Sequence, residues 1–128
     1  SSGVRGFTTI HATNARGALS RLRFLAELSD SARNLPHSAL TTLVTESIDL
    51  VVFSERGTHG PRVREIVAIE DLGADPTTGT FTATDLFIAG SEDGLRWTGA
   101  LPHRLISRPR TGGVDLASML RSSEGAQR

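Results

Sequence analysis

The order of apolar patterns along the chain predicts an α/β fold. A short apolar and β-branched run over residues 7–12 precedes helical periodicity over residues 15–28, and a shorter helical pattern ends near residue 46. Three strand-like runs then follow, at residues 48–55, 63–71 and 80–88. Because this order is typical of the end of an α/β domain, we expect parallel strands first and an antiparallel extension after them.

The first helix is predicted to begin at a capping residue. Thr13 or Asn14 offers the N-cap, because both side chains accept hydrogen bonds from a first helical turn. An apolar stripe at helical spacing follows, formed by Ala15, Ala18, Leu19, Leu22 and Ala26. Gly17 weakens the first turn by up to about 1 kcal/mol relative to alanine, and it leaves room for another group to approach.

The second helix and the strands carry their own signals. Pro36 suits the first turn of a helix. The apolar positions of this helix are Leu40, Leu43 and Val44. Residues 48–55 are nearly continuously apolar, which predicts a strand buried on both faces, and residues 56–61 are expected to form a loop. Residues 80–88 alternate cleanly, which predicts an antiparallel edge strand with one face in solvent.

Beyond Gly90 the periodic signal weakens. We therefore separate residues 1–90, which carry the α/β pattern, from residues 91–128, which are expected to form an arm with a short helix and a disordered end. The helix would span residues 114–122. Its apolar side would consist of Val114, Leu116, Met119 and Leu120.

Composition excludes several classes of function. The 128 residues fit one domain, and a formal net charge of 0 gives no electrostatic case for nucleic acid. All 14 basic residues are arginine, so the chain lacks the lysine with which a P-loop reaches phosphates. There is no cysteine, which excludes thiolate metal sites. No apolar run approaches the roughly 20 residues that span a bilayer, and the first residues lack a signal-peptide pattern.

His11 and two arginines are the candidate site residues. His11 ends the first predicted strand, where ligands gather in open α/β sheets. It could donate to a phosphate oxygen beside the helix N-terminus, or be a partly buried histidine satisfied by a carbonyl, and the residues leave both interpretations open. Arg16 and Arg21 lie about 140° apart round the helix, so they cannot both face one phosphate. Arg16 could point toward a ligand near His11, and for each arginine a solvated helix face is the alternative.

Other polar residues are expected to be structural. Acid–base chemistry needs carboxylates close together, which the spacing of Glu46, Asp49 and Asp85 does not show. We expect Asp49 to cap or to pair structurally. His37, His59 and His103 lack metal-ligand spacing, so no metal site is predicted.

Residues 2–22, "SGVRGFTTIHATNARGALSRL", resemble the histidine box of the type II/IV secretion ATPase superfamily, and most closely its Flp/Tad pilus-assembly branch. Residues 46–69 resemble the next landmark of that family, and "TDLF" at residues 84–87 resembles its last strand. Twelve positions match the box without a gap. These are Gly3, Gly6, Thr9, Ile10, His11, Ala12, Ala15, Arg16, Ala18, Leu19, Arg21 and Leu22.

This resemblance implies the C-terminal half of a RecA-like P-loop NTPase core. In the family, upstream Walker A and Walker B segments bind ATP and Mg²⁺, so the chain alone would bind no cofactor and would not hydrolyse ATP. His11 would sense the γ-phosphate and Thr9 and Asn14 would set the turn. Arg16 and Arg21 would be electrostatic partners within the site or across a subunit boundary.

The resemblance also implies a setting and leaves an alternative. The full-length protein would be a cytoplasmic hexamer at the inner face of the membrane, with a pilus or secretion platform protein as its partner and no nucleic acid. The sequence departs from the family at "HATN", where "HANS" is common, and at Gly3 and Val4, where many members have a second histidine. The alternative function is a non-catalytic α/β module, or a truncated remnant, that binds or regulates an ATPase ring.

Overall fold

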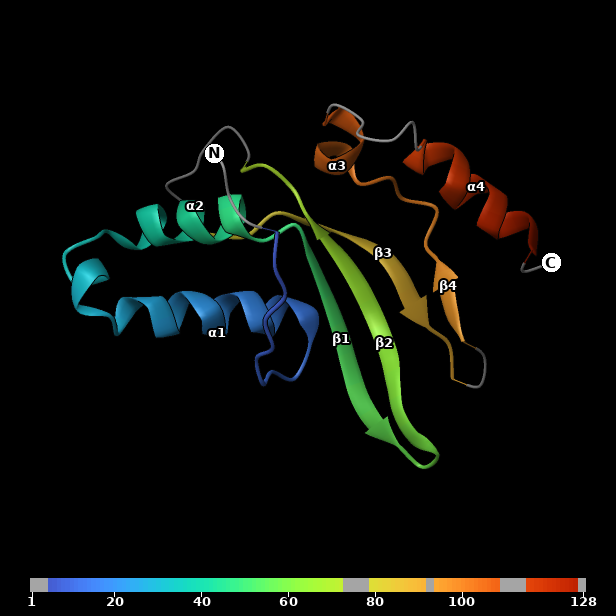
Figure 1. Cartoon of the computed structure of the whole chain (residues 1–128), viewed down its shortest axis with the longest axis horizontal. Coiled ribbons are helices and arrows are strands. Elements are labelled where there is room, and N and C mark those ends of the chain that lie inside the picture. The colour runs from blue at the N-terminus through green and yellow to red at the C-terminus, as the bar shows by residue number, and fades with distance from the viewer. Residues whose placement is uncertain (1–4, 73–78, 92–93, 109–114, 127–128) are drawn as a thin grey trace.

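A computed structural model describes residues 5–72, 79–91, 94–108 and 115–126. They form a mixed α/β structure in which two helices precede a four-stranded antiparallel sheet of order β1-β2-β3-β4 (Figure 1). The first helices are α1 (Ala15–Glu27), a 3-10 turn (Asp30–Ala32) and α2 (His37–Ser47). The sheet and the last helices are β1 (Leu50–Gly57), β2 (Gly60–Ile69), β3 (Ala83–Ala89), β4 (Leu95–Trp97), α3 (His103–Ser107) and α4 (Leu116–Ala126).

Helices α1 and α2 lie side by side and pack on the end of the sheet where β1 begins (Figure 1). The centre of this core is Leu19 of α1, Val44 of α2 and Ile69 of β2, all buried. The predicted stripe of α1 therefore faces the core, as its spacing required. Leu43 differs from its prediction: it is exposed, because α2 turns Leu40 and Val44 inward instead.

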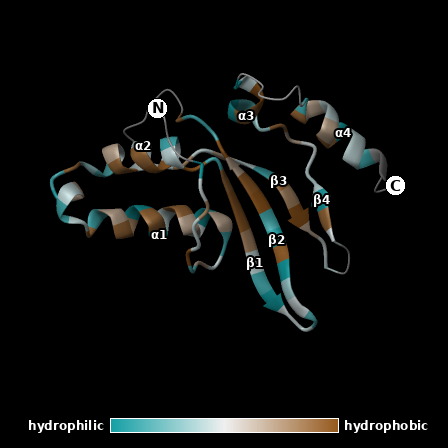
Figure 2. Cartoon of the chain, viewed as in Figure 1, coloured by the Kyte–Doolittle hydropathy of each residue, from teal (hydrophilic) through white to brown (hydrophobic). Residues whose placement is uncertain are grey.

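Strands β1 and β2 form one long hairpin. The loop predicted over residues 56–61 is only a turn at Thr58 and His59, since Gly57 already pairs with Gly60. Gly60 adopts φ +113°, which the absence of a Cβ allows. The hairpin is hydrophobic near the helices and hydrophilic toward its turn (Figure 2), so only the part near the helices contributes to the core, mainly through Val67, Ala68 and Ile69.

The prediction that residues 48–55 are buried on both faces is wrong. Val51 packs against the core, but Leu50 and Val52 point to the other face and are 45% and 56% exposed. The physical reason is that β1 is an edge strand of the sheet and no layer of described residues covers its second face.

The described residues form no parallel strand pair, in contrast to the prediction. Residues 7–12 are extended but form no strand, and all three strand pairs of the described sheet are antiparallel. A strand exists only through hydrogen bonds to a neighbour, and residues 7–12 have none within the described chain. Nor is β3 an edge, because the three-residue strand β4 pairs with its outer side.

The C-terminal region is more regular than its sequence pattern suggested. The helix expected over residues 114–122 is present as α4 and continues to Ala126, beside β4. Leu120 is buried as predicted and Met119 is exposed, while Val114 and residues 127–128 lie outside the described residues. The short helix α3 was not predicted, because five residues give no readable periodicity.

Candidate functional site

A groove of about 590 Å³ separates residues 8–12 from strand β1. Helix α1 forms its floor. The lining consists of Thr8, Thr9, Ile10, His11, Ala12, Ala18, Leu19, Leu22, Leu25, Ile48, Leu50, Val51, Val52, Phe53 and Ser54. The groove thus has two extended walls. One is formed by residues 8–12, which precede α1 in the sequence, and the other by residues 50–54, which follow α2.

The lining pattern shows that the groove runs along backbone edges. Side chains of an extended segment alternate between two faces, so a cavity over one face touches every second residue. Here residues 8–12 and residues 50–54 all line the groove without a gap. Neither wall has a strand partner on its groove side among the described residues, since β1 pairs only with β2. Both walls therefore present free N–H and C=O groups.

Thr9 and His11 lie on this groove, as two of its lining residues. Both are exposed, and neither side chain has a polar partner among the residues that the structure describes. The interpretation of His11 as a buried, carbonyl-satisfied histidine is therefore wrong for this structure. Gly3 and Val4, at which the chain departs from the secretion-ATPase pattern, lie outside the described residues.

The N-cap of helix α1 is Asn14, which confirms one of the two predicted caps. The Asn14 side chain accepts a hydrogen bond from the backbone N–H of Gly17 at 2.6 Å. A Cβ at Gly17 would lie 3.1 Å from the capping oxygen. The group that approaches Gly17 closely is thus the side chain of Asn14, the N-cap residue.

Two carboxylates that the sequence did not reveal also meet the start of α1. Glu65 of β2 accepts a hydrogen bond from the backbone N–H of Ala15 at 2.6 Å. Arg16 donates to Asp85 of β3 and to the carbonyl oxygen of Ala83 at 3.1 Å. The helix terminus expected to attract a phosphate therefore already holds the protein's own anion.

The five predicted site residues divide into separate groups. Thr9 and His11 line the groove, Asn14 caps α1, and Arg16 is paired across to β3. Arg21 is exposed and forms no polar contact with the described part of the chain.

Asp49 pairs with Arg104 and Arg108, which confirms its predicted structural role. Among the described residues, no three carboxylates or histidines gather as metal ligands would. Nor does any described helix have the length and apolarity needed to cross a membrane.

Part of the chain is similar to a curated protein. The conjugal transfer protein TrbB of Rhizobium radiobacter is 38% identical over 65 residues, which are 51% of this chain and 18% of that protein. The match thus spans less than a fifth of the relative's length. No family model matches the chain, and no solved structure matches it significantly.

Proposed function

We propose that this chain is the C-terminal part of a RecA-like ATPase of the type II/IV secretion superfamily, in its Flp/Tad pilus-assembly branch. Two sequence observations support the proposal. Residues 2–22 resemble the family's histidine box, and the chain is similar to part of a conjugal transfer protein. The whole protein would act as a cytoplasmic hexamer on a membrane platform protein.

The observation that carries the proposal is the groove with two free backbone edges. Residues 7–12 and β1 run in the same direction, and the residues between them contain α1 and α2 (Figure 1). Connections of this kind join parallel strands. A strand placed in the groove would hydrogen-bond to both walls. The rest of the completed domain would then cover the exposed side chains of Leu50 and Val52. The upstream half of an ATPase domain would supply such a strand.

His11 and Thr9 would then lie at the active face of the completed sheet. Ligands of open α/β sheets bind beyond the carboxyl ends of strands, and His11 ends its extended segment. Its ring nitrogen is free to donate to a γ-phosphate oxygen, so we assign it the phosphate-sensing role. Asn14 holds the turn that follows. Arg21 is free to reach a neighbouring subunit, whereas Arg16 would first have to leave Asp85.

ATP and Mg²⁺ would be held by the upstream half. The described residues do not form a phosphate cradle, because the chain has no lysine and the N–H groups of Ala15 and Gly17 are already bonded to Glu65 and Asn14. Bound Mg²⁺ would supply charge neutralisation at the phosphates. This chain would contribute the hydrogen bond from His11 and the rigid turn that aims it.

The test is ATP turnover by the full-length protein with His11→Ala. We expect turnover to fall by about 10²- to 10³-fold, the usual effect of removing one donor to a developing charge. His59→Ala is the matched control, because His59 lies in the distant hairpin turn and should leave turnover unchanged. Unaltered circular dichroism would show that the fold is intact. Normal turnover in His11→Ala would reject the sensor role.

A non-catalytic module is the second candidate, and the same groove favours it. A free strand edge accepts an extended peptide from another protein as readily as one from its own chain. The reading frame upstream of Ser1 distinguishes the two functions. A P-loop there supports the ATPase, and a start codon close to Ser1 supports the module.

A further inference from the structure

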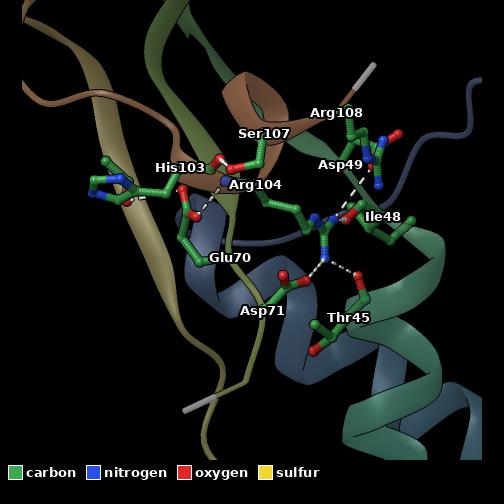
Figure 3. A network of polar contacts seen from close by, with 10 residues as sticks. Thr45, Ile48, Asp49, Glu70, Asp71, His103, Arg104, Ser107 and Arg108 are labelled. Atoms are coloured by element: carbon green, nitrogen blue, oxygen red, sulfur yellow. Dashed lines mark hydrogen bonds and ion pairs between the residues drawn. The ribbon is translucent and has the colours of Figure 1, made fainter.

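The guanidinium of Arg104 joins α3 to the junction between α2 and β1 (Figure 3). Arg104 is only 8% exposed, although it carries a full charge. Its Nη1 donates to the carbonyl oxygen of Thr45 at 2.6 Å, and its Nη2 donates to that of Ile48. Asp49 and Asp71 lie 3.4 and 3.8 Å from the same group.

The backbone of α3 is fixed at the same place. The N–H of Arg104 donates to Glu70 at 3.0 Å, and this buried carboxylate also accepts from Thr84. Arg108 adds an ion pair with Asp49 at 2.7 Å. From here on, the arm means residues 101–108, the part of the predicted C-terminal arm that contains α3. Among the described residues, the polar contacts that join the arm to residues 45–49 and 70–71 are made by Arg104 and Arg108.

The two carbonyls that Arg104 binds are among those left without a helical partner at the end of α2. The last carbonyls of a helix have no helical partner and carry partial negative charge. Ile48 is the C-cap residue of α2, and β1 begins two residues later at Leu50. A buried guanidinium at this point therefore fixes where the helix ends and how β1 starts.

We propose that Arg104 is a positioning residue that couples the arm to the groove edge of β1. When the arm is docked, Arg104 holds the carbonyls of Thr45 and Ile48 and so fixes the direction in which β1 leaves α2. The arm and the groove edge of β1 therefore unfold locally together. A strand that pairs with β1 would stabilise the docked arm, and release of the arm would loosen the edge. The inference rests on contacts within this chain, so it stands independently of the ATPase assignment.

The test compares Arg104→Gln with Arg108→Gln by hydrogen exchange. Both variants lose one positive charge beside Asp49, but only the first loses the carbonyl contacts of α2. In Arg104→Gln we expect exchange to rise roughly 10- to 100-fold in the arm, the last turn of α2 and β1. Residues 67–69 at the centre of the sheet should keep their protection, and Arg108→Gln should change only the arm.

Trp97 gives a second readout. It is the one tryptophan of the sequence, and its indole N–H donates to the carbonyl oxygen of Ala100, next to the arm. Its emission should shift in Arg104→Gln. Arg104→Lys should restore less protection than Arg104 provides, because one ammonium does not reproduce the guanidinium fork that reaches both carbonyls. Full recovery by lysine would reject the need for the fork.

Three results would overturn the coupling. These are a uniform rise of exchange over the whole sheet, a rise confined to the arm, or an unchanged Trp97 emission. If Arg104→Gln does not fold, the unaltered chain is measured at increasing urea below the unfolding transition. The arm and β1 should then share one opening free energy below that of residues 67–69. Separate opening energies would reject the proposal.

Discussion

Glu65 shows how one long-range contact changes the chemistry of a helix terminus. Its carboxylate occupies the N-terminus of α1 through the N–H of Ala15. We expect Glu65→Gln to lower the free energy of unfolding by about 1 kcal/mol, because the amide keeps an acceptor but loses the charge that the helix dipole favours. Urea denaturation measures the change.

Ionic strength separates this effect from a packing defect. The loss in Glu65→Gln should shrink in 1 M salt, where the screening length falls to about 3 Å. Glu55→Gln is the control, since Glu55 forms an exposed ion pair with Arg64 and should change stability by less than about 0.5 kcal/mol. A loss in Glu65→Gln that is independent of salt would contradict the electrostatic explanation.

The start of α1 has two side-chain acceptors, Asn14 and Glu65, and only the first could be predicted from the sequence. Asn14 was predicted as a cap because capping is local, three residues from its donor at Gly17. Glu65 lies 50 residues from Ala15, and no pattern in the sequence announces that pair. Arg16 is similar, because its partner Asp85 becomes a neighbour only when β3 joins the sheet.

At the level of elements, the sequence located α1, α2 and the strands β1, β2 and β3, but it did not predict how the strands pair. A helix satisfies its own backbone, so its apolar spacing is a complete signal, and α1 and α2 end within a residue or two of their predicted bounds. A strand is completed by a neighbour. Residues 7–12 and β1 have strand-like sequences, but their expected partners are not among the described residues. The first stays unpaired and the second is half-exposed.

The bare edge of β1 predicts self-association. Edge strands with free backbone groups and exposed apolar side chains pair with other chains unless something blocks them. The opposite edge is protected, because β4 has only three residues and α4 packs beside it. We expect the chain to form dimers or larger species whose mass rises with concentration in sedimentation velocity. Val52→Lys should shift it toward monomer.

Ile88→Lys controls for the loss of exposed apolar surface. Ile88 is comparably exposed, but it belongs to β3, which has partners on both sides. This variant should associate like the unaltered chain. A monomeric unaltered chain, or equal effects of the two lysines, would show that the β1 edge does not drive assembly.

At the scale of the whole molecule, the family resemblance and the unpaired edge of β1 both favour a further strand beside β1. The resemblance to a histidine box rests on residue types alone, and the setting that it implies would need strands that the described residues do not form. The antiparallel hairpin, α1 and α2 are complete as local units. The groove between residues 8–12 and β1 lies at the edge where the described sheet ends.

Nucleotide binding by the 128-residue chain tests this division directly. We expect no ATP binding detectable by calorimetry, with or without Mg²⁺, and no hydrolysis. The donors at the start of α1 are taken by Asn14 and Glu65, and the sequence has no lysine to reach the phosphates. The full-length protein measured under the same conditions is the positive control. Micromolar binding by this chain alone would mean that its own residues hold the nucleotide, and would contradict the proposal that an upstream half binds the phosphates.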